Sequence, residues 1–260
     1  KIMQVNLSHP VRTTLGSAQR IAELTEKSQA RIATGKKYSS AIEKPIAISI
    51  SNSLSNRAAD LLAIKDNISQ GSSRLKTTLS GLNTIDQTLD QLKAVAYQHA
   101  ATDDVAKQAE LANQFNVIKG QLDNFARDTS YGGTNLIGAS PDDLNINLNE
   151  DGTSSVTITG VASDSATLGV TVTDAASIDA AKAQIRSTAQ VIGSNAGVIE
   201  IRQDFTDKLV NSLQAGEAKL TQTDLNEEAA NILSLQTRGQ LAAAATGIAA
   251  QSERTILQLF

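Results

Sequence analysis

Residues 61–96 read LLAIKDNISQGSSRLKTTLSGLNTIDQTLDQLKAVA. Apolar residues recur at every seventh position of this stretch. Some of the positions three residues after them are apolar as well. The repeating positions are Leu61, Ile68, Leu75, Leu82, Leu89 and Ala96. A heptad stripe sustained over this length indicates a long helix that needs a helical partner along all of it.

A second stripe with the same period lies late in the chain, at Ile178, Ile185, Ile192 and Ile199, and it continues past a polar position at Thr206. Two long stripes far apart in sequence predict antiparallel helices packed lengthwise into a rod. The candidate residues of the rod core are Leu61, Ile68, Leu75, Leu82, Leu89, Ile178, Ile185, Ile192 and Ile199.

Breaker and cap residues predict where the helices begin and end. Gly35 follows Thr34 and predicts a left-handed cap at the end of a first helix that starts near Pro10. Pro45 is suited to open the next helix, over about 46–101. Asp103-Asp104 predicts a turn and an N-cap. The remaining helices are expected at 105–127, 178–220 and 224–260.

The period changes from helical to two beyond Pro141, because Leu144, Ile146 and Leu148 alternate with asparagines. Glu150-Asp151-Gly152 predicts a hairpin turn, after which a second strand returns over 156–159. A third strand is expected over 168–173. We expect this small, polar insert to face solvent, so that deletion of residues 140–173, with the gap bridged, spares assembly with other copies of the chain.

The two ends of the chain carry apolar stripes that find no partner within their own half. We expect them to pair with each other and with other copies of the chain, because folded monomers rarely leave such stripes uncovered. The residues assigned to this contact are Val5, Val11, Leu15, Ile21, Leu24, Ile32, Leu235, Leu241, Ile248, Ile256, Leu259 and Phe260.

The sequence thus predicts a mainly α fold, a long antiparallel helical rod with paired terminal helices and a small β-hairpin insert. Three domains are expected: residues 1–34 with 221–260 as a terminal coiled coil, residues 35–138 with 174–220 as the helical rod, and residues 139–173 as a variable β insert.

Composition excludes several functions. Aromatic residues make up only 3% of the chain, cysteine is absent and the formal net charge is −4, so disulfides, thiolate chemistry and a nucleic-acid footprint are not expected. No apolar run is long enough for a membrane span, and none near residue 1 resembles a secretory signal. Secretion would therefore use another route.

No constellation of an enzyme or a metal site is present. His9 and His99 have no clustered ligands. Asp142-Asp143 with Asn145 suggests calcium only weakly, because the twelve-residue loop with its terminal glutamate is missing. We therefore expect no catalytic residue, no metal and no cofactor.

Several motifs of the chain resemble those of bacterial flagellins, in their order and separation. These motifs are RIATG at 31–35, TSYGGTNL at 129–136, RQDF at 202–205, NEEAAN at 226–231 and ILQLF at 256–260. The resemblance covers roughly 1–138 and 174–260, and RQDF is most similar to flagellins of alphaproteobacteria.

The resemblance implies the subunit of a helical flagellar filament for swimming motility, a secreted extracellular structural protein whose terminal helices form an inner tube. It also implies unfolded export through a type III channel, an export chaperone on the C-terminal helix, and contact with filament cap and hook-associated proteins. The alternative is a hook–filament junction protein, which would stop at short rings. A third interpretation, an adhesin built on the β insert, is disfavoured because the insert lacks aromatic residues.

Animal innate receptors recognise some flagellins on the second helix. The counterpart residues in this chain are Gln91, Lys93, Val95 and Gln114. Gln91 stands where the recognised pattern has an arginine, and Gln114 replaces a glutamate of the family. We therefore expect this chain to be a poor activator of such a receptor.

Overall fold

The computed structural model describes residues 9–257, apart from the side chains of residues 10, 253, 256 and 257. The chain divides into two compact units, one of residues 1–56 with 213–260 and one of residues 57–212. Its elements are α1 (His9–Thr34), α2 (Pro45–Ala100), α3 (Val105–Asp128), β1 (Leu144–Asn147), β2 (Ser155–Ile158), α4 (Ala175–Thr221) and α5 (Leu225–Leu257). The predicted mainly α fold with a small β hairpin is confirmed.

The helix ends follow the cap residues seen in the sequence. Gly35 takes a positive φ of 66° after the last residue of α1, a conformation that glycine adopts without strain. Pro45 is the first residue of α2. The carboxylate of Asp104 caps α3 by accepting from the backbone N–H groups of Ala106 and Lys107.

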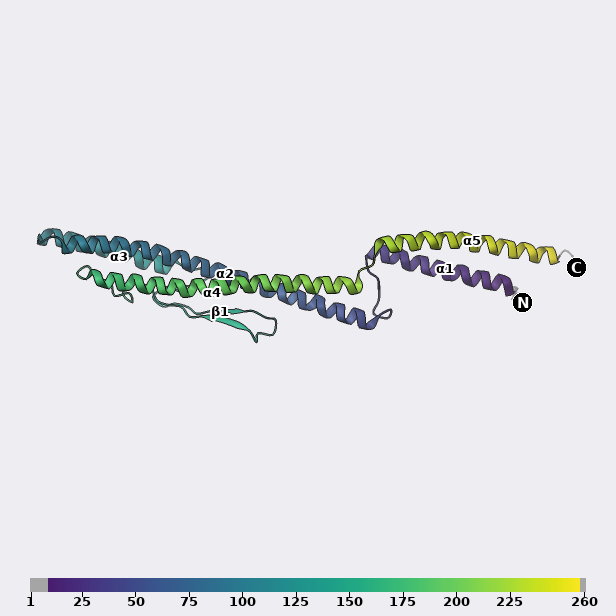
Figure 1. Cartoon of the computed structure of the whole chain (residues 1–260), viewed down its shortest axis with the longest axis horizontal. Helices are drawn as coiled ribbons and strands as arrows, with labels where there is room; N and C mark the ends of the chain where they lie inside the picture. The colour runs from purple at the N-terminus through teal and green to yellow at the C-terminus, as the bar shows by residue number, and fades with distance from the viewer. Residues whose placement is uncertain (1–8, 258–260) are drawn as a thin grey trace, which may run out of the picture. The chain divides into compact units, whose positions relative to one another are not determined.

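The core of unit 57–212 lies between α2, α3 and α4, which run alongside one another (Figure 1). All nine candidate residues of the rod core are buried, with exposures of 3% or less. Ion pairs along α2 and α4 show that these helices are antiparallel: the Lys65 Nζ lies 2.6 Å from Asp207, and the Lys93 Nζ lies 2.5 Å from Asp179.

Thr206 does not interrupt the core, although it is a polar residue within the α4 stripe. Its side chain is 1% exposed, and its hydroxyl donates a 2.9 Å hydrogen bond to the carbonyl of Arg202. Bonding back to the preceding turn is a common way for threonine to occupy a buried helix position.

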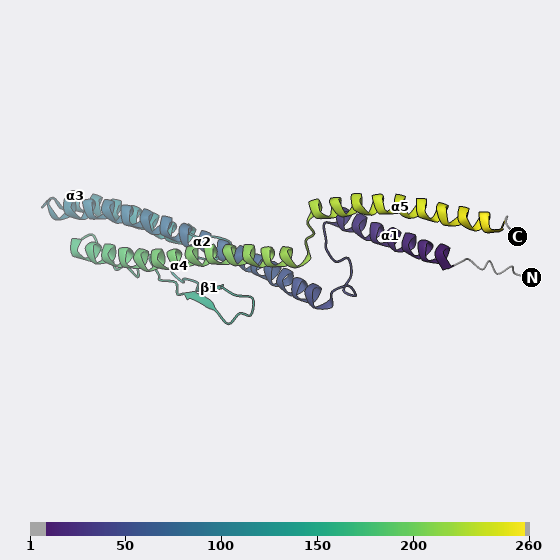
Figure 2. The same ribbon diagram turned by 45° about the vertical axis from the view of Figure 1, so that its right-hand side comes forward.

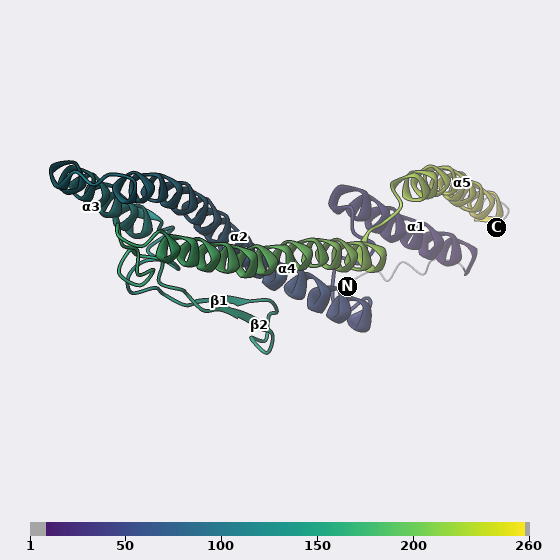
Figure 3. The same ribbon diagram turned by 60° about the vertical axis from the view of Figure 1, so that its left-hand side comes forward.

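The β hairpin is part of this core. β1 and β2 are antiparallel, with Leu144 opposite Ile158 and Asn147 opposite Ser155, and the hairpin lies along α4 in Figure 3. The insert contributes six buried apolar residues to the same cluster as the helices: Leu144, Ile146, Leu148, Ile158, Leu168 and Val170. The expectation that the insert only decorates the surface is therefore wrong, because one face of its alternating strand covers the helices.

The expected third strand over 168–173 is also wrong. Gly169 turns the chain with a positive φ of 64°, and the following residues are used to cap α4. The carboxylate of Asp174 accepts a 2.9 Å hydrogen bond from Ala176 N, and the Thr171 N–H donates to the Ser177 hydroxyl at 3.2 Å. Backbone donors committed to a helix N-terminus are not available for a strand ladder.

Two glycines inside α2 permit close packing. A Cβ added at Gly71 would overlap the side chain of Ile146, and a Cβ added at Gly81 would overlap three atoms of Thr129. Thr129 cannot easily move, because it caps α3 and its hydroxyl donates to Phe125 O at 2.7 Å. These glycines therefore set the distances of β1 and of the α3 C-terminus from α2.

We expect Gly81→Ala to lower the free energy of unfolding by about 1–3 kcal/mol through overpacking, in spite of the better helix propensity of alanine. The control is Gly120→Ala in α3, where an added Cβ meets nothing within 4 Å. That change should stabilise the chain by about 0.5–1 kcal/mol. Urea unfolding followed by circular dichroism measures both. Equal stabilisation by the two changes would contradict the close-packing account.

Candidate assembly interface

Helices α1 and α5 form an antiparallel pair within unit 1–56 with 213–260, and they lie side by side in Figure 2. The segments next to the pair are joined by backbone hydrogen bonds: Lys37 N donates to Thr221 O at 2.6 Å, and Thr223 N donates to Gly35 O at 3.0 Å. The C-terminal end of α1 and the N-terminal end of α5 are therefore held together.

A buried polar contact sets the register of this pair. Glu228 of α5 is 5% exposed and Ser28 of α1 is 6% exposed. The Ser28 hydroxyl donates to Glu228 Oε2 at 2.7 Å, and Arg31 Nη1 donates to Oε1 at 3.0 Å. Because a buried carboxylate without partners is costly, other registers of the pair are disfavoured.

The pKa of Glu228 reflects this contact. Burial by itself raises the pKa of a carboxyl group, but the hydrogen bonds from Ser28 and Arg31, the positive charge of Arg31 and a hydrogen bond from Asn231 outweigh it. The pKa of Glu228 therefore lies below its ordinary value, and the group is ionised at neutral pH.

Most apolar residues of the pair are left uncovered. On α1, Leu15, Leu24 and Ile32 are 42%, 45% and 37% exposed, and on α5, Leu241 and Ile248 are 65% and 69% exposed. Val11 and Ile21 are half-buried, and Leu235 is buried. Val5, Leu259, Phe260 and the side chain of Ile256 lie outside the described residues.

Leu225 and Leu233 extend the uncovered surface of α5 and were not assigned to it from the sequence. They are 53% and 66% exposed. At 3.6 residues per turn, Leu233 projects from the opposite side of α5 to the buried Leu235. The spacing of both leucines was visible in the sequence, but which side of α5 meets α1 was not.

The residues that correspond to the receptor-recognised pattern of some flagellins lie in unit 57–212. Gln91 and Gln114 are exposed, while Val95 is buried. Lys93 pairs with Asp179 and lies over the ring of Tyr97 at 5.6 Å from its centroid. The expected weakness toward a receptor stays a prediction.

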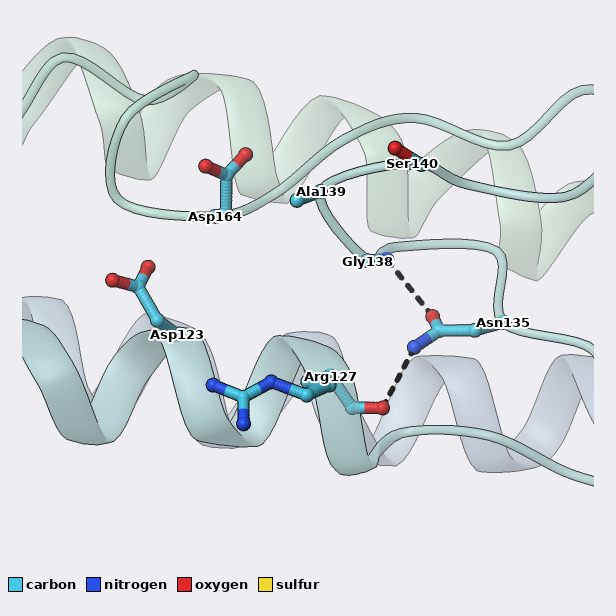
Figure 4. Close-up of a pocket in the computed structure, with 7 residues that line it drawn as sticks. All are labelled: Asp123, Arg127, Asn135, Gly138, Ala139, Ser140 and Asp164. Carbon is cyan, nitrogen blue, oxygen red and sulfur yellow. Dashed lines mark hydrogen bonds between the residues drawn. The ribbon is translucent and has the colours of Figure 1, made fainter.

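A cavity of about 450 Å³ lies next to α3 (Figure 4). Its lining residues are Asp123, Arg127, Asn135, Gly138, Ala139, Ser140 and Asp164. Asn135 donates to the carbonyls of Ala126 and Arg127 and accepts from Gly138 N. Asp123 accepts from the Ser165 N–H and hydroxyl. These groups fasten the loops to α3, so their role is structural.

The residues that the structure describes form neither a metal cluster nor a membrane-spanning helix. None of them form a group of three or more histidine, cysteine, aspartate or glutamate side chains arranged to hold a metal ion. Within the same residues, no helix combines the length and the apolar character needed to cross a membrane.

Comparison with known proteins identifies the family. The profile of the bacterial flagellin N-terminal helical region matches residues 5–140. The flagellin FljM of Caulobacter vibrioides is 30% identical over 251 residues, which cover 92% of this chain and 91% of that protein. The chain belongs to the bacterial flagellin family. A flagellin of Brucella melitensis is 26% identical, over 90% of this chain and 91% of its own length.

As a flagellin, the chain is a structural subunit of the bacterial flagellar filament, an extracellular appendage. These two relatives align with 90% or more of the chain and carry the name flagellin, and nothing in them favours the alternative of a hook–filament junction protein.

Proposed function

We propose that this flagellin assembles into its filament through the uncovered apolar faces of α1 and α5. In this arrangement residues 1–34 and 221–260 form the inner tube, residues 35–138 and 174–220 form the rod around it, and residues 139–173 lie on the outside. A head-to-tail contact that does not close into a ring produces a helical polymer of this kind.

The proposal rests on the difference in exposure between the apolar residues of the heptad stripes and those of α5. In the α2–α4 stripes, Ile68, Leu75 and Leu82 are fully buried, whereas Leu241 and Ile248 on α5 are more than three-fifths exposed. Leu241 and Ile248 are seven residues apart and so lie on the same side of α5, and large apolar side chains exposed along one side of a helix favour a protein–protein contact. The partner we assign is another copy of the same chain, since both helices of the pair present such residues.

We further propose that α1 and α5 become ordered only on assembly. Few of the described residues of the pair are buried in the single chain, so the cost of ordering two long helices is met by contacts with neighbouring copies. Such a chain can be exported unfolded and secreted, with a chaperone on the C-terminal helix, and can then meet cap and hook-associated proteins at the filament. We assign it no catalytic activity and no cofactor.

Electron microscopy of the purified chain after seeding, with proteolysis of the unassembled form alongside, tests the proposal. We expect long filaments and rapid loss of both chain ends from the unassembled form. Short rings would support the hook–filament junction protein instead. Protected ends in a chain that stays monomeric would identify a self-contained bundle and would refute assembly through α1 and α5.

Glu228→Gln should weaken the α1–α5 pair in assembled filaments by about 1–3 kcal/mol per subunit, because it removes the charged acceptor of Ser28 and Arg31. Since folding lowers the pKa of Glu228, its contribution is complete above the ordinary glutamate pKa of about 4.3 and is lost as the pH falls through the lower folded value. The variant should therefore lose part of the acid sensitivity of the wild type.

Thermal dissociation of filaments between pH 7 and pH 3, followed by circular dichroism, measures this effect. The control is Glu227→Gln, which makes the same change at the neighbouring exposed position and should leave the dissociation temperature nearly unchanged. Equal effects of the two substitutions would contradict a specific role of Glu228.

A further inference from the structure

One side of α4 in unit 57–212 carries large apolar side chains that remain about half exposed or more. Ile201 and Phe205 are 72% and 50% exposed, and Val198 is 49% exposed. Four positions at intervals of four residues form a ridge along this side, here called the α4 ridge: Gly193, Gly197, Ile201 and Phe205. A single exposed apolar residue is ordinary, but several along one side of a helix indicate a contact surface.

The two glycines of the α4 ridge are not explained by packing within the chain. Gly193 and Gly197 lie inside α4, where glycine is less favourable than alanine. A Cβ added at either position would meet nothing within 4 Å, whereas a Cβ added at Gly71 or Gly81 of α2 would overlap neighbouring side chains. Glycines in such open surroundings are suited to the close approach of a second helix.

Two carboxylates border the α4 ridge. Glu200 and Asp204 are exposed, and within the described residues neither side chain forms an ion pair or a hydrogen bond. Asp207, on the next turn, instead pairs with Lys65. Lys208 is exposed four residues beyond Asp204 and forms no ion pair with either carboxylate in the described chain. Unit 57–212 as a whole carries 19 acidic and 12 basic residues, so the ridge is an apolar surface with an acidic border on a negatively charged unit.

A groove of about 260 Å³ between α1 and α5 has the opposite charge and a similar apolar character. Its lining residues include Leu24 and Leu235, three cations (Lys27, Arg31 and Arg238) and no carboxylate. Arg238 is exposed, and its side chain has no ion pair or hydrogen bond among the described residues. Unit 1–56 with 213–260 carries 11 basic and 8 acidic residues. The groove is therefore an apolar surface with a basic border on a positively charged unit.

We propose that the α4 ridge of one copy packs into the α1–α5 groove of a second copy, with the acidic border of the ridge against the basic border of the groove. The proposal rests on the proposed function, because a filament places copies against one another. Charge complementarity selects this occupant, since the two units carry opposite net charges and the two surfaces have opposite borders. A ridge that enters a groove of the next copy is a heterologous contact, which an open helical polymer requires.

The contact brings Asp204 next to Arg238 and Glu200 next to Lys27. Arg238 is available for this pairing because it has no partner among the described residues. Lys27 lies 3.7 Å from a carboxylate oxygen of Glu43, with its own side chain 60% exposed. Because an exposed pair of this kind contributes little, Lys27 can exchange Glu43 for a carboxylate of the second copy.

Seeded polymerisation of the full chain with exchanged charges tests the contact. We expect Asp204→Arg and Arg238→Asp each to raise the critical concentration about 10-fold or more, because each substitution brings like charges together. The chain with both substitutions should assemble within about threefold of the wild type, since the pair is restored with its charges exchanged. The control is Asp66→Arg, at an exposed acidic position of α2, which should change the critical concentration less than about twofold.

Circular dichroism of each monomer shows whether it remains folded. If Asp204→Arg assembles like Asp66→Arg, this contact is refuted while the proposed function stands. If both single variants fail and the double variant fails equally, the α4 ridge does not enter the α1–α5 groove, and the assigned partner surface is refuted. A wild-type chain that forms no filaments would refute the proposed function and this contact together.

Gly197→Ala tests the same contact without a change of charge. We expect the unfolding temperature of the monomer to rise by about 1–4 °C, because alanine favours the helix. The critical concentration should nevertheless rise about fivefold or more, because the added Cβ holds the second copy away. The control is Gly120→Ala in α3, where an added Cβ also meets nothing within 4 Å; it should raise the unfolding temperature similarly and leave assembly unchanged. Assembly of Gly197→Ala at the critical concentration of the wild type would refute close packing on the α4 ridge.

Discussion

Deletion of residues 140–173, with the gap bridged by a short linker, is expected to abolish cooperative unfolding of unit 57–212. The deleted segment contains the six buried apolar residues of the insert. Burial of one such side chain contributes about 1.5–3 kcal/mol, so their combined loss is similar to the whole stability of a typical domain, about 5–15 kcal/mol.

The matched control shortens only the tip of the hairpin, by replacing residues 150–153 with Asn-Gly. This change removes the ion pair between Arg57 and Glu150, whose side chains are 54% and 18% exposed, and the hydrogen bond that Asn149 donates to Thr153. A partly exposed ion pair and one hydrogen bond at the hairpin tip together contribute about 1–2 kcal/mol, far less than the six buried side chains, so this variant should melt much closer to the wild type than the deletion does. Thermal unfolding followed by circular dichroism compares the three chains. A cooperative transition at the wild-type temperature in the deletion variant would contradict the role of the insert in the core.

The helices of this fold could be predicted from the sequence because their signals are local or periodic. The seven-residue spacing of Leu61, Ile68 and Leu75 requires a buried stripe whatever surrounds it. Gly35, Pro45 and Asp104 act on the backbone within a turn of their own position. For the same reason the alternation of Leu144 and Ile146 predicted β1 correctly.

The sequence predicted which long helices pair, but not the other tertiary contacts. The alternating strand shows that one face is apolar, but not whether that face meets the helices of the same chain, and this led to the wrong expectation for the insert. From the sequence, Gly81 is only a residue of low helix propensity. Its close contact with Thr129 depends on where α3 ends. Glu228 likewise reads as a first-turn carboxylate, whereas its partners Ser28 and Arg31 lie 200 and 197 residues away.

The second large effect is expected from removal of Leu225–Phe260. The truncated chain should form no filaments, because α1 loses its partner and the exposed leucines of α5 are lost. The core of unit 57–212 draws its buried residues from α2, α3, α4 and the hairpin, so its cooperative unfolding should persist. Electron microscopy and thermal unfolding measure the two results. Filaments of normal diameter from the truncated chain would refute assembly through α5.

Truncation alone does not separate the pairing of α1 with α5 from contacts between copies, but substitutions on the uncovered face do. Leu241→Asp with Ile248→Asp should also prevent filaments, because two charges would be buried without partners between copies. The control is Gln236→Asp with Gln251→Asp, which adds the same charge at exposed polar positions and should slow assembly only modestly. If both double variants polymerise alike, the exposed apolar residues are not the contact surface. If only the first fails, contact between copies runs through the face of α5 that α1 leaves uncovered.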